Sequence, residues 1–575
     1  MNQAELNQVT TSKPVIKSAP DYPISEEVRA NTHLVENQPP PLENYEAYCD
    51  DLALKEAVHR EGAGWAEASL ESFGKTTGSR EKIDWGIYAN ANKPIFASHS
   101  QYGQRIDEVT FHPSYHQLMS DSKANGLHSL PWLEHKPGAY VARSAAYYLQ
   151  GQIEAGHLCP ITMTHACIPT LRKQANIADE WQTKILNPIY DSRNLPHFEK
   201  EGLTIGMAMT EKQGGSDVRT NSTKAYPIGI DGPGQAYELV GHKYFVSAPM
   251  SDGFLVLAQA VGGISCFLVP RWRPDGTKNP IQLNQLKDKM GNVSNASSET
   301  ELRGAFGWLI GEEGRGIAHI LEMVALTRFD CMLGSAAIMR QAVTQILHHC
   351  AYRSAFGKKL IEQPMMQNVL ADLSLESEAA LALSMRIARA QDCKTGDPIE
   401  SMLVRLGTAV GKYWVCKRTP AHAYEAMECI GGSAVMENSL MPRLYREAPI
   451  NTIWEGSGNV QCLDVLRALR KEPELLDAYL VMVNRVRGEH RILDSAIDKI
   501  PNLFKDSDSL EYRARHITEH LALTLQASVL VANGNDMLSD GFIQARMNEG
   551  SGHVYGMLPV NIDCKGIIER NQISV

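Results

Sequence analysis

The spacing of apolar residues changes character along this 575-residue chain, and that change limits which folds are available to it. From residue 45 to about residue 202, apolar residues recur at helical spacing, as at residues 52–57, 145–154 and 161–171. From residue 203 to about 309 the runs are short and alternating or β-branched, with Gly, Pro and Asp between them, as at residues 237–240, 253–258, 264–269 and 281–286. Helices followed by a small β-domain are therefore predicted.

Helical patterns return from residue 314 to about 469, at residues 317–350, 365–392 and 399–428. A last helical segment, at about 475–532, ends in a Gly- and Asn-rich tail. This order predicts an α+β (mainly α) fold. Its parts are a disordered tail (1–36), an N-terminal helical domain (37–202), a middle β-barrel or β-sandwich domain (203–310), a C-terminal helical bundle (311–470) and a helical extension (471–575).

Composition narrows the class of protein further. No apolar run approaches the roughly 20 residues that span a bilayer, and the first 36 residues contain no apolar segment of a secretory signal. The eleven cysteines form no Cys-x-x-Cys pair and no metal-like spacing with His. We therefore expect reduced core thiols, a cytoplasmic location and no metal site. The net charge of −10 gives no support for a duplex-DNA binder, which normally carries a basic face.

One carboxylate stands in a setting suited to proton transfer. In Ile453-Trp454-Glu455-Gly456-Ser457-Gly458-Asn459, Glu455 lies between bulky apolar residues and a small, flexible turn. Partial desolvation raises the pKa of a carboxylate and makes it a proton acceptor near neutral pH. The following turn offers backbone amides and short polar side chains for a polar cofactor. The alternative is a solvated loop glutamate.

A second segment, Met207-Ala208-Met209-Thr210-Glu211-Lys212-Gln213-Gly214-Gly215-Ser216-Asp217-Val218, follows a strand-like run. Its paired glycines allow the backbone to approach a ligand closely, and its hydroxyls stand beside N–H groups. The glycine spacing is not that of a Rossmann fingerprint, and no Gly-Lys-Ser/Thr closes a P-loop. The alternative is a surface hairpin loop.

Together these segments resemble the catalytic-glutamate and flavin-binding motifs of the acyl-CoA dehydrogenase superfamily. Three further matches follow the family order: Lys243-Tyr244-Phe245-Val246-Ser247, Arg353-Ser354-Ala355-Phe356-Gly357-Lys358-Lys359-Leu360, and Glu428-Cys429-Ile430-Gly431-Gly432. Arg60-Glu61-Gly62-Ala63-Gly64-Trp65, Asp288-Lys289-Met290-Gly291-Asn292 and Arg443-Leu444-Tyr445-Arg446-Glu447 are similar to its AidB-like branch of alkylation-response flavoproteins. The resemblance extends over nearly all of the chain after about residue 37.

This resemblance implies that FAD is the cofactor and assigns residues to it. Phe245, Val246 and Ser247 would back the flavin ring, Ser457 and Asn459 would meet its pyrophosphate and adenosine side, and Arg353 and Phe356 would come from a neighbouring subunit. The complete implied set is Met207, Met209, Thr210, Gly215, Ser216, Phe245, Val246, Ser247, Arg353, Phe356, Gly431, Gly432, Trp454, Ser457 and Asn459. Since one flavin would use two subunits, the resemblance implies an oligomer, and a homotetramer is expected.

The resemblance also implies the chemistry. Glu455 would remove the α-proton of an acyl-CoA thioester, and the flavin N5 would accept the β-hydride. The Glu455 backbone N–H and a ribityl hydroxyl would hold the enolate oxygen. Ser216, Arg328 and Glu455 would contact the substrate, and electrons would leave through an electron-transfer flavoprotein. From the residues alone, Arg353 could instead end a helix, Ser247 could be a strand polar residue, and Arg328 could form a helix-surface salt bridge.

Three positions depart from the family pattern. Glu428 stands where the family has Gln, and Pro364 falls near another usual Gln, while Phe245 replaces a usual Trp by another aromatic ring. Members of the AidB-like branch dehydrogenate acyl-CoAs poorly although they retain the glutamate. Slow turnover is therefore compatible with the motifs.

The extension bears on the choice of partner, because in the AidB-like branch this region is associated with duplex DNA. Here residues 471–575 carry eleven basic and fifteen acidic residues, a net charge of −4. Its local basic clusters are more typical of solvated helix faces. Three functions remain open: an FAD-dependent acyl-CoA dehydrogenase, an AidB-like flavoprotein that binds DNA, and a protein that sequesters a long acyl-CoA without turnover.

Overall fold

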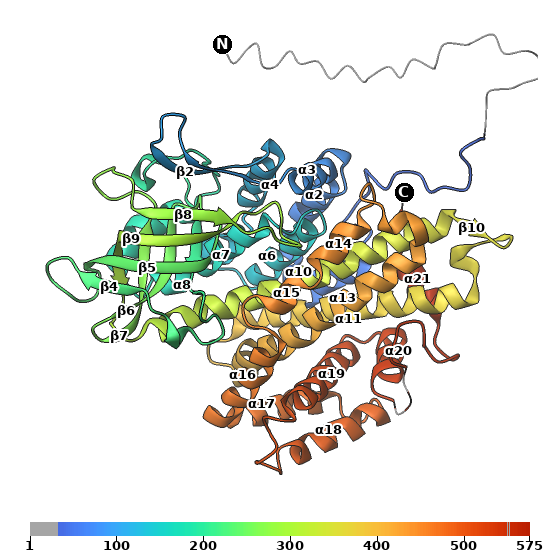
Figure 1. The fold of residues 1–575 in the computed structure, drawn as a ribbon. Helices are drawn as coiled ribbons and strands as arrows, with labels where there is room; N and C mark the ends of the chain where they lie inside the picture. The colour runs from blue at the N-terminus through green and yellow to red at the C-terminus, as the bar shows by residue number, and fades with distance from the viewer. Residues whose placement is uncertain (1–32, 549, 551, 575) are drawn as a thin grey trace, which may run out of the picture.

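The computed structural model of the chain describes residues 33–548, 550 and 552–574. A β-barrel lies at one end of the molecule, N-terminal helices and a bundle of long helices adjoin it, and the C-terminal extension packs along the bundle (Figure 1). The predicted α+β (mainly α) class, with helices, then a β-domain, then helices, is confirmed. Of the predicted N-terminal tail, residues 1–32 lie outside the described residues.

The N-terminal part is helical except for one hairpin. Its elements are α1 (Leu52–Arg60), α2 (Glu67–Thr77), α3 (Arg80–Ala91), β1 (Ile95–His99), β2 (Arg105–Thr110), α4 (Pro113–Ala124), α5 (Leu130–Leu133), α6 (Ala139–Gly151), α7 (Leu158–Ala166), α8 (Ile168–Leu171) and α9 (Ala175–Ile185). The antiparallel β1–β2 hairpin was missed by the helical reading of residues 45–202. Its strands are largely exposed, so they carry little of the apolar alternation by which a strand is recognised.

The middle domain is a barrel built on one seven-stranded sheet, in the order β3-β5-β4-β6-β7-β9-β8. Its strands are β3 (Ile205–Ala208), β4 (Lys224–Pro227), β5 (Ala236–Ser247), β6 (Gly253–Ala260), β7 (Gly263–Pro270), β8 (Ile281–Leu286) and β9 (Ser297–Ile310). Further pairings of β3 with β6 and of β5 with β9 close the sheet on itself. β6 and β7 are nearly continuous apolar runs, because most of their residues are buried whichever face of the sheet they occupy.

The rest of the described chain is mostly helical. The bundle contains α10 (Gly316–Tyr352), β10 (Ser354–Ala355), β11 (Lys358–Lys359), α11 (Pro364–Cys393), α12 (Pro398–Met402), α13 (Thr408–Ile430), α14 (Met441–Glu447), α15 (Ile450–Ile453) and α16 (Gly458–Lys471). The extension contains α17 (Glu474–Val483), α18 (Arg491–Leu503), α19 (Ala514–Ala532), α20 (Asp536–Arg546) and α21 (Cys564–Asn571). The tail expected after residue 532 is thus partly helical, which corrects the prediction.

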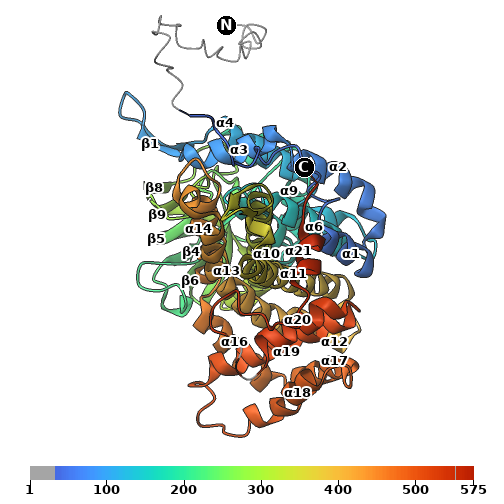
Figure 2. The ribbon, with the colours of Figure 1, turned by 90° about the vertical axis from the view of Figure 1, so that its right-hand side faces the viewer.

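The extension shares a core with the bundle. A quarter turn of the view places α17–α20 along one side of α11 and α13, remote from α3 and α4 (Figure 2). Apolar residues of α19 such as Leu521 and Leu525 are buried in the same cluster as Leu381 of α11 and Val410 of α13. Burial of such side chains stabilises by roughly 1.5–3 kcal/mol each. The extension is therefore an integral part of the bundle. No helix among the described residues is both long and apolar enough to cross a membrane.

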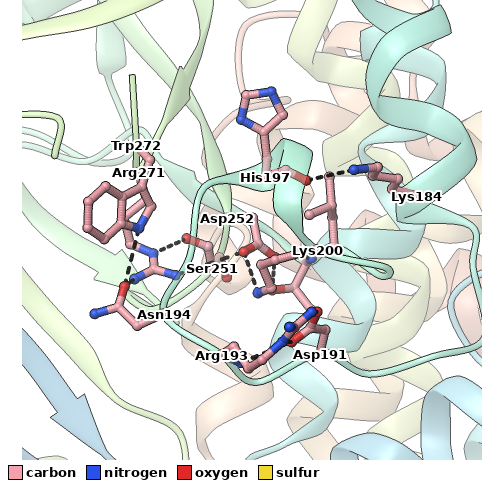
Figure 3. A network of polar contacts seen from close by, with 12 residues as sticks. Lys184, Asp191, Arg193, Asn194, His197, Lys200, Ser251, Asp252, Arg271 and Trp272 are labelled. Atoms are coloured by element: carbon pink, nitrogen blue, oxygen red, sulfur yellow. Dashed lines mark hydrogen bonds and ion pairs between the residues drawn. The ribbon is translucent and has the colours of Figure 1, made fainter. Parts of the chain in front are cut away.

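A buried polar network fastens the loop before β3 to the barrel (Figure 3). Lys200, in the loop before β3, forms an ion pair of 2.6 Å with Asp252 at the start of β6. Asp252 also accepts from the backbone N–H of Thr204 at 2.8 Å, and Arg271 donates to the Ser251 carbonyl at 3.1 Å. Because both members of the Lys200–Asp252 pair are almost fully buried, the loop and the sheet hold one fixed arrangement.

Candidate active site

Glu455 occupies the turn between α15 and α16, in a backbone conformation that few non-glycine residues adopt. Its φ is +58°, and the next residue, Gly456, has φ +99°. A side chain at Gly456 would bring its Cβ within 2.8 Å of Gln461 Nε2, so this position requires glycine. Left-handed backbone at a non-glycine residue is characteristic of functional sites.

Side chains from two helices hold this turn in place. Lys412 of α13 donates to the carbonyl oxygens of Trp454 at 2.9 Å and Gly456 at 2.6 Å. Gln461 of α16 donates from Nε2 to the carbonyl oxygens of Glu455 at 3.1 Å and Gly456 at 3.0 Å. In the described part of the chain, the Glu455 backbone N–H donates to no other group. That N–H is free to stabilise an oxyanion.

Several neighbouring groups act on the Glu455 carboxylate. Burial raises the pKa of Glu455, and the Thr327 hydroxyl, Arg328 and Lys412 oppose that rise. Thr327 of α10 donates to Glu455 Oε2 at 2.8 Å across 128 residues of sequence. A raised pKa makes a carboxylate a stronger base, which suits it to removing a weakly acidic proton.

Thr327→Val tests this tuning. Loss of the hydroxyl removes a hydrogen bond that stabilises the charged carboxylate, so the pKa of Glu455 rises further. The pH profile of flavin reduction by substrate should move to higher pH, because the ionised base forms later in a titration. Thr76→Val, at a hydroxyl that contacts only its own helix, is the control. An unshifted profile would contradict the role assigned to Thr327.

Cys159, at the start of α7, connects the Glu455 turn with the barrel. Burial raises the pKa of the Cys159 thiol to about 12, and both Glu455 and the Ser247 hydroxyl act on it. Ser247 of β5 lies 3.2 Å from the Ser297 hydroxyl, to which Lys289 donates at 2.9 Å. The Cys159 thiol is therefore influenced by two groups that are far apart in sequence, the Glu455 carboxylate and the Ser247 hydroxyl.

The predicted flavin segments on the barrel present one outward face. Met207 of β3 pairs with Ser247 of β5, and Phe245 on β5 is 41% exposed. The Val246 side chain is buried in the barrel core, so Val246 offers only backbone to a ring on that face. Gly215 lies against Thr210, whose Cγ2 would be 3.0 Å from an added Cβ. Met209 and Ser216 lie on the same loop.

Four other residues predicted to bind the flavin lie at the end of the bundle away from Glu455. Arg353 and Phe356 lie at the end of α10 and in the β10–β11 hairpin, and Gly431 and Gly432 follow α13. Arg353 is 26 residues along α10 from Thr327, about 39 Å at the rise of a helix. Phe356 is fully exposed with φ +53°. Within one chain, the predicted flavin-binding residues therefore form two separated groups.

Arg328 contacts the backbone of the Glu455 turn. Its Nε donates to the Glu455 carbonyl at 3.0 Å, and its Nη1 pairs with Asp464 at 2.8 Å. The salt bridge weighed as an alternative is therefore present, and a substrate contact by Arg328 stays a prediction. Thr327, Lys412, Gln461 and Cys159 were not selected as site residues, because isolated residues on apolar helices carry no local signal of a site. Among the described residues, no group of His, Cys, Asp and Glu is arranged to hold a metal ion.

Comparison with known proteins identifies the class. Residues 314–470 match the C-terminal domain of acyl-CoA dehydrogenases, residues 206–305 the middle domain, and residues 37–192 the N-terminal domain of the adaptive response protein AidB. The chain belongs to the acyl-CoA dehydrogenase family.

Within that family the similarity is to the AidB branch. The chain is 46% identical to the putative acyl-CoA dehydrogenase AidB of Escherichia coli strain K12, over 91% of this chain and 95% of that protein. It is 28% identical to acyl-CoA dehydrogenase family member 11 of Caenorhabditis elegans, over 82% of this chain and 80% of that protein. The structure of C. elegans ACDH-11 in complex with C11-CoA superposes with a TM-score of 0.81 at 24% identity, over 94% and 93% of the two chains.

The residues present fit FAD, the cofactor that family membership identifies. The outward face of β3 and β5 offers Phe245 and Ser247 to a ring, and the Glu455 N–H is unused in the described structure. Beside it, the buried Gln461 Oε1 has no hydrogen-bond partner among the described residues. Such an atom is expected where a polar ligand binds.

Proposed function

We propose that this flavoprotein removes the α-proton and the β-hydride of an acyl-CoA thioester, with Glu455 as the base. The observation that carries the proposal is the Glu455 turn. Burial raises the pKa of its carboxylate, to which Thr327 donates, while Arg328, Lys412 and Gln461 donate to the backbone carbonyls of the turn. Bound FAD supplies the hydride acceptor.

The protein's own residues remove the proton and stabilise the developing negative charge. Glu455 takes the proton from Cα, and its own backbone N–H donates to the thioester oxygen as negative charge develops there. Lys412 and Gln461 fix the carbonyls of the turn, so this N–H keeps its direction. Substrate that covers Glu455 excludes water and strengthens the base when it is needed. The C11-CoA found with C. elegans ACDH-11 supports an acyl-CoA as the ligand.

The assembly is proposed to be a homotetramer in which each flavin uses two chains. Support comes from the separation of Arg353 and Phe356 from Glu455, and from the full exposure of the Phe356 ring. An Arg guanidinium suits a pyrophosphate, which it binds bidentately. We further propose a cytoplasmic location and electron transfer to an electron-transfer flavoprotein.

Duplex DNA remains the weaker proposal for a partner. Several basic side chains of the extension are paired within the chain: Arg487 with Asp498, Arg546 with Asp372 and Glu376, and Arg570 with Glu56 and Glu378. An arginine that is already paired with a carboxylate offers less positive charge to the phosphates of DNA. These contacts favour the dehydrogenase over a DNA-binding function.

An anaerobic titration of the yellow protein with acyl-CoAs of graded chain length tests the proposal. We expect one chain class to bleach the oxidised flavin band, because proton and hydride removal reduces the flavin. Free CoA, which has no acyl α-proton, is the control. A flavin that stays oxidised with every acyl-CoA would refute dehydrogenase chemistry, and tight binding without bleaching would instead indicate sequestration.

A further inference from the structure

Asp464 of α16 pairs with arginines from two other segments of the bundle. Arg328 of α10 donates from Nη1 to Asp464 Oδ2 at 2.8 Å. Arg405 donates from Nη1 to Oδ2 and from Nη2 to Oδ1, both at 3.2 Å. The side chains of Arg328 and Asp464 are largely buried, at 14% and 13% exposed. One carboxylate therefore joins α10, α16 and the segment before α13.

The two arginines keep Asp464 ionised. Burial acts to raise the pKa of Asp464, but Arg405 and Arg328 oppose it, and the pKa lies below its ordinary value. Hydrogen bonds between ionised partners are shorter and stronger than neutral ones, and the planar guanidinium gives them a fixed direction. The orientation of the Arg328 guanidinium is therefore set by a strong and directional contact.

The same guanidinium also contacts the Glu455 turn. Arg328 Nε donates to the Glu455 carbonyl at 3.0 Å, and an added Cβ at Gly456 would lie 3.4 Å from Arg328 Nη2. Because the guanidinium is rigid and planar, a contact that holds Nη1 at Asp464 also fixes the direction of Nε. Asp464 therefore acts on the Glu455 backbone through Arg328.

Two neighbouring residues of α10 hold the two ends of Glu455. Thr327 donates to the Glu455 carboxylate at 2.8 Å, and Arg328 donates to the Glu455 carbonyl. The φ of +58° at Glu455 lies in the left-handed region, which a non-glycine residue keeps only when its surroundings hold it there. Loss of the carbonyl contact would let the turn rotate and would move the carboxylate and the backbone N–H together.

Arg405 lies on an irregular turn of helix. Residues Leu403–Gly407 form a π-helix between α12 and α13. Such turns are rare and frequently occur at functional sites. The π-helix leads directly into α13, whose Lys412 donates to the carbonyls of Trp454 and Gly456. One continuous segment thus contacts both Asp464 and the Glu455 turn.

We propose that Asp464 is a positioning residue, which holds Arg328 so that the Glu455 carboxylate and backbone N–H keep the orientation that proton removal requires. The inference rests on the proposed function, because it takes Glu455 as the base. Asp464 takes no proton in the reaction and acts through Arg328. The Arg328–Asp464 salt bridge is then part of the catalytic arrangement as well as of the fold.

Stopped-flow reduction of the flavin tests this role, with the acyl-CoA that reduces the wild-type protein fastest, at saturation. Asp464→Leu removes both carboxylate oxygens at similar size and should slow reduction about 10²-fold, the loss that a displacement of about 1 Å can cause. Asp464→Asn keeps one oxygen to accept from Arg328 and should recover part of that loss. The dissociation constant of the acyl-CoA should stay near the wild-type value, because the lost alignment acts on the transition state.

Glu400 provides a matched control for the loss of a buried ion pair. It accepts from both Nη groups of Arg386 at 2.7 Å, and their side chains are similarly buried. Glu400→Met should lower the thermal stability much as Asp464→Leu does, but its flavin should be reduced at the wild-type rate. Equal losses of rate in the two variants would trace the effect to general destabilisation and overturn the inference.

A double variant tests whether Asp464 acts through Arg328. If it does, Arg328→Gln alone and Arg328→Gln combined with Asp464→Leu should be equally slow, since Asp464 matters only while Arg328 is present. Effects that multiply would overturn the inference, as would an Asp464→Leu protein that is reduced at the wild-type rate. The proposed function would stand in both cases. A wild-type flavin that no acyl-CoA reduces would overturn both proposals.

Discussion

Glu455→Gln should slow flavin reduction by an acyl-CoA about 10³-fold, within the range that a general base contributes. The amide has nearly the same shape and can keep the Thr327 contact of 2.8 Å, but it accepts no proton. Stopped-flow loss of the oxidised flavin band under anaerobic conditions measures the effect. The rate of the wild-type protein should rise with pH through the raised pKa of Glu455, since the ionised form is the active one.

Binding measurements on Glu455→Gln distinguish the loss of the base from a disturbed binding site. Flavin content and acyl-CoA affinity should remain near those of the wild-type protein, because the lost group acts on the reacting proton. Glu472→Gln, at an exposed glutamate just after α16, is the control and should reduce its flavin normally. A Glu455→Gln protein that retains a rate within tenfold of wild type would exclude Glu455 as the base.

Asp330→Asn should lower the free energy of unfolding by about 3–5 kcal/mol, the usual cost of leaving one member of a buried ion pair alone. Arg143 of α6 and Asp330 of α10 pair through both guanidinium Nη groups, and both side chains are almost fully buried. Thr162 of α7 also donates to Asp330 at 2.7 Å. Loss of the carboxylate charge leaves the Arg143 cation in the core. Urea unfolding followed by circular dichroism measures the change.

The same substitution in an exposed pair provides the comparison. Asp288 pairs with Lys93 at 2.7 Å, but their side chains are 88% and 58% exposed. Asp288→Asn should therefore destabilise the protein much less than Asp330→Asn does. Equal losses in the two variants would contradict the assignment of the large effect to burial.

Long elements were predictable where burial imposes a regular period on the sequence. The strand predicted at residues 281–286 is β8 itself, and the helix predicted at 317–350 is α10 to within two residues at either end. Features with weak apolar patterns were missed. The β1–β2 hairpin is largely exposed, and the helices α20 and α21 are short and follow Gly- and Asn-rich segments.

The sequence by itself determined the order of helical and β segments, the family, and the glutamate proposed as the base. Each of these depends on neighbouring residues, whose spacing and type are visible along the chain. Only the tertiary structure decided what surrounds Glu455 and that Asp464 meets Arg328. The pKa of a carboxylate depends on the charges, donors and solvent within a few ångströms. Those neighbours come from α7, α10, α13 and α16, and only packing brings the helices together.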